Sequence, residues 1–113
     1  MKEFQIYSLF NWYCSWNGCT GIPYNPICGS GKNSAILHYH SNDKELKDGD
    51  FILNDMGCRE NMYCSDITNT YPINGKFSQK QKEIYNIVLE VIFYIKNIGT
   101  KCHAQRSETR CDL

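Results

Sequence analysis

Two aspartates eleven positions apart, Asp55 and Asp66, are the residues of this 113-residue chain whose type and spacing best support chemistry. The surrounding sequence predicts a β-hairpin with strands over 51–59 and 62–70, joined by a two-residue turn at Glu60-Asn61. In that register Asp55 lies directly opposite Asp66, with the two Cβ atoms roughly 4.5–5.5 Å apart on one face. Because two like charges at that separation repel each other, we expect either a bound cation or protonation of one acid.

The register of this hairpin has an alternative. Glu-Asn is a poorer two-residue turn than Asn-Gly or Asp-Gly, and a bulge would shift the pairing by one residue. A shift of one residue would place the two aspartates on opposite faces of the sheet. The spacing alone therefore leaves two interpretations open: half of a metal site, or two exposed aspartates on an ordinary edge hairpin.

Several separated pieces of the chain recur in order, and at the right intervals, in a known family. They are YNPICGSGKNSAILHYH, KELKDGDFILNDMG and YCSDITNTYPINGKFSQKQKEIYNIVLEV. Over residues 24–91, about three-fifths of the chain, the sequence closely resembles prolidase (Xaa-Pro dipeptidase) and the proline-specific aminopeptidases (aminopeptidase P). The resemblance implies a pita-bread metallopeptidase that uses two Mn²⁺ ions and a metal-bridged hydroxide to hydrolyse the peptide bond next to proline.

The same resemblance implies a role for individual residues. Asp55 corresponds to a ligand of one metal ion, and Asp66 to the ligand that bridges both. His38 matches a catalytic histidine that lies beside the metals and contacts the substrate. Tyr24 stands where prolidases have a tyrosine near the metal centre, on the substrate side. Thr68, in the SDIT motif, matches a threonine that supports the metal ligands from behind.

The family completes its metal site with one histidine and two glutamates from the second half of the domain, which have no match in this chain. Two of the five ligands are therefore present, and two carboxylates alone would hold Mn²⁺ or Mg²⁺ loosely. One of the missing glutamates also transfers protons, a contribution of typically ~10²–10⁴-fold in rate. We expect little activity from this chain by itself. The partners implied are proline-containing peptides and either a second copy, as a homodimer, or a separate C-terminal half.

Two other functions stay open at this point. One is a non-catalytic relative that only binds peptides or proteins, as a histone-chaperone subunit on this fold does; retention of both aspartates and of His38 speaks against it. The other is a truncated product without function, because the sequence stops resembling the family after about Ile98. We therefore expect a partial catalytic domain over 1–99 and a divergent tail over 100–113.

The predicted fold class is α/β in the α+β sense: an antiparallel hairpin sheet flanked by an N-terminal helix and a long C-terminal helix. A strand over 35–40 would place His38 and His40 on one face. Ser78 and Gln81 fit a capping box at the start of the second helix, and Gly99 fits its end. The other expected elements are a helix over 2–16, a short extended piece over 26–29 and a polar loop over 43–50.

Composition narrows the function classes further. Twelve basic and twelve acidic residues give a net charge of zero, which argues against binding to nucleic acid or to an anionic membrane surface. The first residues, MKEFQIYSLF, lack the apolar core of a secretory signal, so a reduced, cytoplasmic location is expected. The odd number of cysteines and the absence of a CxxC pair make disulfides and a zinc site poor predictions. The seven cysteines are Cys14, Cys19, Cys28, Cys58, Cys64, Cys102 and Cys111.

Overall fold

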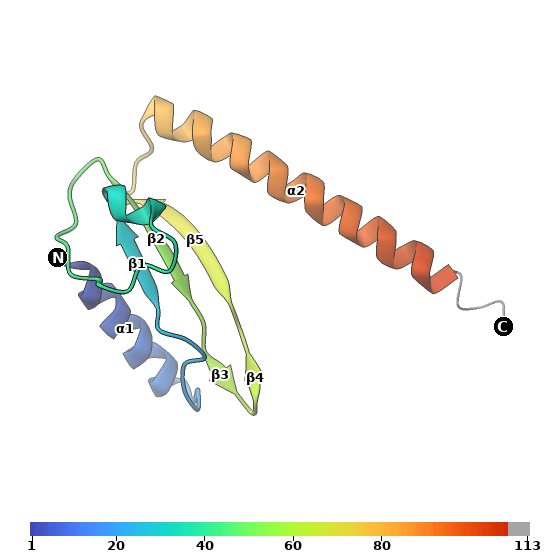
Figure 1. Cartoon of the computed structure of the whole chain (residues 1–113), viewed down its shortest axis with the longest axis horizontal. Coiled ribbons are helices and arrows are strands. Elements are labelled where there is room, and N and C mark those ends of the chain that lie inside the picture. The colour runs from blue at the N-terminus through green and yellow to red at the C-terminus, as the bar shows by residue number, and fades with distance from the viewer. Residues whose placement is uncertain (109–113) are drawn as a thin grey trace. The chain divides into compact units, whose positions relative to one another are not determined.

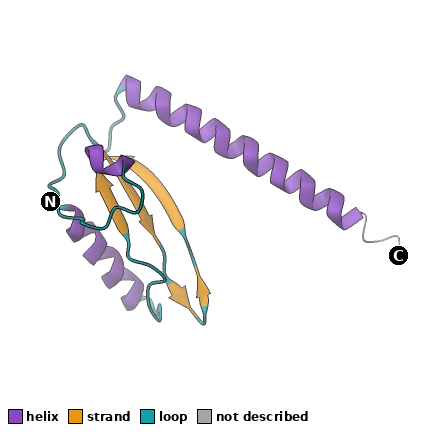
Figure 2. Cartoon of the chain, viewed as in Figure 1, coloured by secondary structure: helices purple, strands orange, loops and turns teal. Residues whose placement is uncertain are grey.

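The computed structural model describes residues 1–108, and side chains over 1–99. The chain divides into two units, Met1–Lys76 and Phe77–Leu113. Both helices and the antiparallel sheet of the expected α+β fold are present (Figures 1 and 2). The elements are α1 (Glu3–Trp16), β1 (Ile27–Ser30), the 3₁₀ helix η1 (Gly31–Ala35), β2 (Phe51–Met56), β3 (Arg59–Glu60), β4 (Tyr63–Cys64), β5 (Ile67–Pro72) and α2 (Gln79–Glu108).

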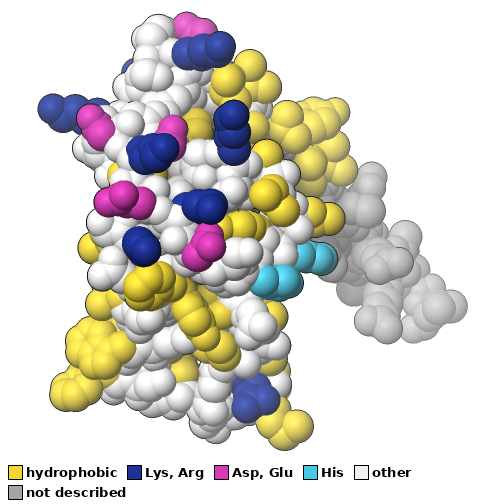
Figure 3. All heavy atoms as spheres, turned by 60° about the vertical axis from the view of Figure 1, so that its left-hand side comes forward, with side chains coloured by type: hydrophobic (Ala, Val, Ile, Leu, Met, Phe, Trp, Pro, Cys, Tyr) yellow, Lys and Arg dark blue, Asp and Glu magenta, His cyan; other side chains and the backbone are white. Residues whose placement is uncertain are grey.

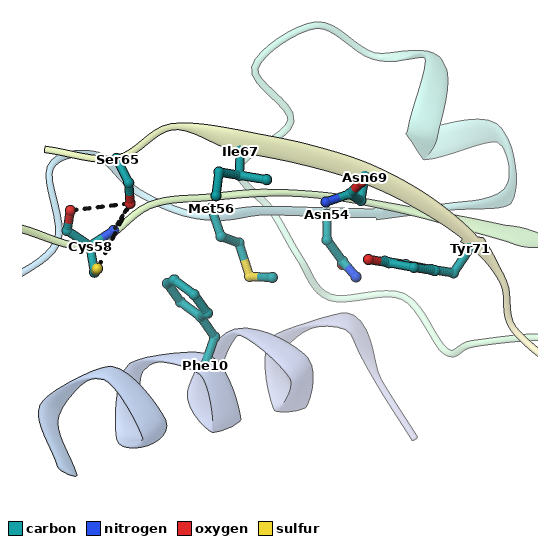
Figure 4. Close-up of a pocket in the computed structure, with 8 residues that line it drawn as sticks. All are labelled: Phe10, Asn54, Met56, Cys58, Ser65, Ile67, Asn69 and Tyr71. Atoms are coloured by element: carbon teal, nitrogen blue, oxygen red, sulfur yellow. Dashed lines mark hydrogen bonds between the residues drawn. The ribbon is translucent and has the colours of Figure 1, made fainter. Parts of the chain in front are cut away.

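The first unit is a three-stranded antiparallel sheet in the order β1-β2-β5, and the β3-β4 ribbon prolongs the hairpin between β2 and β5. Helix α1 lies along one face of this sheet, with Phe10 directed toward Met56 and Ile67 (Figure 4). Because side chains alternate along a strand, the neighbours of Met56 in β2 face the other way. Asp55 therefore lies on the sheet face away from α1, with its cross-strand partner Thr68.

The hairpin register differs from the predicted one by two residues. Asp55 pairs with Thr68 rather than with Asp66, and Arg59 pairs with Cys64. The turn is formed by Asn61-Met62, with φ values of 47° and 70°. Two-residue hairpin turns of type I′ need positive φ at both central residues, and asparagine adopts such values readily. A shift of two, unlike a shift of one, keeps every side chain on its expected face.

Helix α1 begins one residue later than expected and ends at the expected place. The backbone N–H of Lys2 donates to Gln5 Oε1 at 2.7 Å, and the N–H of Gln5 donates to the carbonyl of Lys2 at 3.0 Å. These bonds satisfy donors that the first turn of a helix leaves free. Gly18, with φ of 90°, follows the last turn. The expected end at Asn17-Gly18 is thus confirmed.

The strand expected over 35–40 does not form. Instead η1 ends at Ala35, and the chain turns through His38, whose φ of 51° is incompatible with a strand. The hydroxyl of Ser34 donates to the carbonyl of Gly31 at 2.7 Å, a local bond that stabilises the 3₁₀ turn. The two exposed histidines of this region, His38 and His40, still lie together, with ring centroids 6.5 Å apart, and are visible as neighbours in Figure 3.

Helix α2 has the expected start but a different end. Ser78 and Gln81 form the predicted capping box: the N–H of Ser78 donates to Gln81 Oε1 at 2.8 Å, and the N–H of Gln81 donates to Ser78 Oγ at 3.3 Å. The helix continues through Gly99 to Glu108, so the stop predicted at Gly99 is wrong. A glycine inside a helix costs only about 1 kcal/mol, which the flanking helix formers offset. Among the described residues, no helix is long and apolar enough to cross a membrane.

Candidate metal centre

The carboxylates of Asp55 and Asp66 meet at one atom. The hydroxyl oxygen of Tyr24 lies 2.7 Å from Asp55 Oδ1 and 3.0 Å from Asp66 Oδ1. Asp55 belongs to β2, and Asp66 directly precedes β5, so the convergence does not require the two acids to be cross-strand partners. The structure therefore brings together two of the residues that the sequence singled out, with Tyr24 between them.

One hydroxyl cannot satisfy both acids, because Tyr24 has a single proton to donate. Burial, followed by the hydrogen bonds to Asp55 and Asp66, raises the pKa of Tyr24, so the phenol stays protonated at neutral pH. One of the two contacts is then left without a proton at any moment. A cation beside the two acids would relieve that shortage by binding the carboxylate oxygens that the hydroxyl leaves free.

The glycine that follows Met56 leaves the space that lets the segments carrying Asp55 and Asp66 approach each other. Gly57 is buried, and the place where a Cβ would stand is occupied by the backbone carbonyl oxygen of Ser65 and approached to 3.1 Å by Cε1 of Tyr24. The chain segments that carry Asp55 and Asp66 therefore approach more closely here than side chains would allow. In the DMG motif the glycine therefore meets a packing requirement, beside the candidate ligand Asp55.

His38 reaches the same face from a different element. Together with Asp55 and Thr68 it lines a cavity of about 310 Å³, whose other walls are Ile27, Ser34, Ala35, Ile36, Leu37 and Leu53. The imidazole is exposed, so it is accessible to a molecule entering the cavity. The sequence nominated five residues: Tyr24, His38, Asp55, Asp66 and Thr68. Asp55 shares the cavity with His38 and Thr68, and the Tyr24 hydroxyl connects Asp55 to Asp66.

Glu3 is a residue that the sequence pattern missed. It is fully buried, and its two carboxylate oxygens accept hydrogen bonds from the segments on either side of His38. The donors are the Ser30 N–H (2.7 Å) and hydroxyl (2.6 Å), Asn33 Nδ2 (3.4 Å), the Tyr39 hydroxyl (2.8 Å) and the Lys44 N–H (3.0 Å). Helical periodicity assigns this position no role, and only the three-dimensional structure shows that Glu3 anchors the segment that carries His38.

The electrostatics of Glu3 agree with this role. Burial raises the pKa of its carboxyl, but the hydrogen bonds from Ser30, Lys44 and Tyr39 lower it more, so the pKa ends below the ordinary value of 4.5. The same contact acts in the opposite direction on the phenol: burial, and then the bond to Glu3, raises the pKa of Tyr39 to about 12. At neutral pH Glu3 is therefore an ionised acceptor held by neutral donors.

The donor set at Asp55 and Asp66 fits a hard divalent cation. Carboxylate oxygens are the ligands that Mg²⁺ and Mn²⁺ prefer, and Asp66 is exposed while Asp55 is half-buried, so the pair is open to solvent on one side. The two carboxylates offer oxygen ligands and not the sulfur ligands that soft ions such as Cu(I) prefer. The fold and the site together define a class, that of α+β proteins in which two aspartates of an antiparallel sheet region converge as candidate ligands for a divalent cation.

Comparison with known proteins identifies this class. The pattern of metallopeptidase family M24 matches residues 1–104. Xaa-Pro aminopeptidase of Escherichia coli is 58% identical over 88 residues, which are 78% of this chain and 19% of that protein. Xaa-Pro dipeptidase of Homo sapiens is 48% identical over 94 residues, which are 79% of this chain and 19% of that protein.

Solved structures agree. An alanine variant of Escherichia coli aminopeptidase P superimposes with a TM-score of 0.81 at 44% identity, covering 83% of this chain and 21% of that one. A zinc-substituted form of the same enzyme in complex with product gives a TM-score of 0.78 at 47% identity, over 80% of this chain and 20% of that one. The chain belongs to metallopeptidase family M24, and it has part of the pita-bread fold of aminopeptidase P. It spans about a fifth of the length of the relatives it matches.

Replacing Tyr24 by phenylalanine tests the role of the shared hydroxyl. We expect the free energy of unfolding to fall by about 1–2 kcal/mol, because a partly buried carboxylate loses a hydrogen-bond donor. The affinity for Mn²⁺ should fall by ~10-fold or more, as it does when a group that orients a ligand is lost. Urea unfolding and calorimetric titration measure the two effects. The control is Tyr63→Phe, at a side chain that is 83% exposed; an equal loss in both variants would refute the role of Tyr24.

Proposed function

We propose that this chain provides metal-binding carboxylates and part of the substrate cleft of a proline-specific metallopeptidase, an Xaa-Pro aminopeptidase or dipeptidase. The observation that carries the proposal is the meeting of Asp55 and Asp66 at the Tyr24 hydroxyl. Two kinds of relative support it, since this chain is similar both to Xaa-Pro aminopeptidases and to Xaa-Pro dipeptidases. The proposed substrates are accordingly peptides with proline after the scissile bond.

In this proposal Asp55 would hold one Mn²⁺ ion and Asp66 would contribute to holding both. When bound, the metal pair would supply Lewis-acid polarisation of the scissile carbonyl and a lowered pKa for water. The chain's own residues position the reactants. Tyr24 keeps its proton and orients the carboxylate oxygens, and Thr68 supports Asp55 from the neighbouring strand. His38 contacts the substrate from the wall of the 310 Å³ cavity.

Full activity needs more than these residues supply. Two carboxylates leave most coordination positions of Mn²⁺ to water or to ligands from outside the described residues. We propose that those ligands come from the rest of the catalytic domain, whether it lies on the same polypeptide, on a separate chain or on a second copy of this chain. The chain by itself would then bind Mn²⁺ weakly and hydrolyse Xaa-Pro peptides slowly or not at all.

Calorimetric titration of the chain with Mn²⁺, run beside an Xaa-Pro dipeptide hydrolysis assay, tests this function. We expect weak binding that disappears in the Asp55→Asn/Asp66→Asn variant, because neutral amides bind a hard cation far less well than carboxylates. The matched control is Asp48→Asn/Glu60→Gln, which removes the same two charges from exposed positions and should leave binding unchanged.

Two outcomes would contradict different parts of the proposal. Equal Mn²⁺ affinity in the Asp55→Asn/Asp66→Asn variant and in the unaltered chain would show that the metal centre lies elsewhere. Rapid hydrolysis by the chain alone, at a rate that does not depend on protein concentration, would show that one copy needs no ligands from another chain. Hydrolysis that rises with the square of the protein concentration would instead support assembly of the site from two copies.

A further inference from the structure

Three cysteines that are distant in sequence meet on the opposite face of the sheet from Asp55. Cys14 lies in the last turns of α1, Cys19 in the loop that follows, and Cys58 between β2 and β3. Their Sγ atoms all lie within 4.8 Å of one another. Cys14 is buried, while Cys19 and Cys58 are half-buried, so the cluster is reachable from solvent but largely enclosed by protein.

Backbone hydrogen bonds hold these three positions together. The N–H of Cys19 donates to the carbonyl of Cys14 at 3.0 Å, which folds the loop back onto the end of the helix. The next residue, Thr20, donates its N–H to the carbonyl of Arg59 at 2.8 Å, and the N–H of Arg59 donates to the carbonyl of Gly21 at 2.8 Å. The loop is therefore bound to β3, the strand that follows Cys58. Backbone hydrogen bonds, and not bonds between the thiols, bring the three cysteines together.

The position of Cys58 is fixed from the other strand as well. The backbone N–H of Cys58 donates to the Ser65 hydroxyl oxygen at 3.0 Å (Figure 4). The backbone N–H of Ser65 donates to the carbonyl of Cys58 at 2.9 Å. A site whose ligands stand on elements fixed in this way loses little entropy when it binds an ion. The three sulfurs thus have the preorganisation that a metal site requires.

We propose that Cys14, Cys19 and Cys58 form a binding site for a thiophilic metal ion, with Zn²⁺ as the reference ion. A Zn–S bond of about 2.3 Å places tetrahedrally arranged sulfurs ~3.8 Å apart, so small rotations of side chains now within 4.8 Å suffice to close the site. Thiolates select soft ions, whereas the Asp55 and Asp66 carboxylates select hard ones. The two faces of the sheet would therefore bind different metals.

A fourth position is available beside the sulfurs. Asn11 lines a cavity of about 230 Å³ together with Cys14 and Cys19. Its Oδ1 atom is buried and has no hydrogen-bond partner among the described residues, which is costly for an amide oxygen. A water on the fourth coordination position of the ion would provide the donor that this oxygen lacks. Three protein ligands and one water is also a known arrangement around zinc.

Proton release accompanies binding, because each sulfur coordinates as a thiolate. A hydrogen bond from Cys19, and then one from Ser65, lower the pKa of Cys58. Burial raises the pKa of Cys14, and the bond to Cys58 raises that of Cys19 to about 11. Cys14, Cys19 and Cys58 therefore each lose their thiol proton to solvent as their sulfurs bind the ion. No electron is transferred in this step.

Titration of the reduced chain with Co²⁺, a spectroscopic substitute for Zn²⁺, tests the proposal. We expect a sulfur-to-cobalt charge-transfer band that Zn²⁺ abolishes by displacement. Cys14→Ser, Cys19→Ser and Cys58→Ser should each weaken binding by more than the ~10–100-fold that loss of an outer partner costs. The controls are Cys64→Ser, which removes an exposed thiol outside the cluster, and Cys102→Ser/Cys111→Ser; both should keep the band.

A second measurement needs no variant. In the unaltered chain, saturation with Zn²⁺ should protect three thiols from a thiol-specific reagent, which guards against serine variants that fail to fold. The Asp55→Asn/Asp66→Asn variant should retain the charge-transfer band, so this test is independent of the proposed peptidase function. Absence of the band, its survival in all three serine variants, or unchanged thiol reactivity with Zn²⁺ would each overturn the proposal.

Discussion

Replacing Glu3 by alanine is expected to lower the free energy of unfolding by about 3–5 kcal/mol, a large effect for a single residue. The change removes an ionised, fully buried acceptor and leaves several donors on Ser30, Tyr39 and Lys44 without a partner. Each buried donor left unsatisfied costs about 1–3 kcal/mol, although relaxation and water make the sum smaller than the parts. Urea unfolding followed by circular dichroism measures the change.

A suitable control for this substitution is Glu45→Ala, which removes the same side chain from an exposed position and should change the unfolding free energy by less than about 0.5 kcal/mol. Losses of similar size in the two variants would show that the Glu3 network contributes no specific stability. The network also bears on function, because Glu3 holds Asn33 and Tyr39 on either side of His38. In the Glu3→Ala variant the segment that carries His38, which lines the same cavity as Asp55, should therefore lose its anchoring bonds.

The pH dependence of the Glu3 contribution has a definite sign. The folded-state pKa of Glu3 lies below its ordinary value of 4.5, so the folded chain binds fewer protons there than the unfolded chain. The stabilisation is fully present above pH 4.5 and is lost as pH falls through the folded pKa. Glu3→Gln cannot ionise, so the stability gap between it and the unaltered chain should be widest near neutral pH and narrow in acid. A gap that widens in acid would contradict this sign.

The sequence predicted which residues of the hairpin share a face, because this depends on a short-range pattern, but the direct pairing of Asp55 with Asp66 was wrong. Alternation of side chains fixes which residues share a face. A shift of two residues leaves this alternation unchanged, so Asp55 and Thr68 still lie together on the cavity side of the sheet. The register itself was wrong because the turn falls on Asn61-Met62. Methionine at positive φ is unusual, and no turn rule would have chosen that pair over Glu60-Asn61.

The features that the sequence did not predict depend on contacts between distant segments. The residues over 35–40 have strand-like composition, yet the bonds of Asn33 and Tyr39 to Glu3 hold this segment in a turn. Likewise, the spacing of Cys14, Cys19 and Cys58 matches no zinc motif, because Cys58 reaches the cluster through the fold of the sheet rather than along the chain. The sequence pattern carries no information on such juxtapositions until the topology is known.

Replacing Gly57 by alanine is expected to destabilise the first unit by about 3 kcal/mol, at the upper end of the usual cost of overpacking. The new methyl group would collide with the backbone carbonyl of Ser65 and stand 3.1 Å from the ring of Tyr24. The φ angle of Gly57 is not positive, so its backbone conformation does not oppose alanine. The obstacle to the substitution is the lack of space for a methyl group. Neither neighbour is the end of a flexible side chain, so the two strand segments must move apart.

That separation should be measurable at the proposed metal centre as well as in the free energy of unfolding. Asp55 and Asp66 lie on the two segments that Gly57 and Ser65 bring together, so Mn²⁺ affinity in Gly57→Ala should fall ~10-fold or more, as for other changes that displace ligands. The matched control is Gly99→Ala in α2, where a Cβ meets nothing within 4 Å. That change should raise helix stability by up to about 1 kcal/mol and leave Mn²⁺ binding intact. If Gly57→Ala unfolded at the same urea concentration as the unaltered chain and bound Mn²⁺ equally well, the close approach at Gly57 would have no part in forming the site.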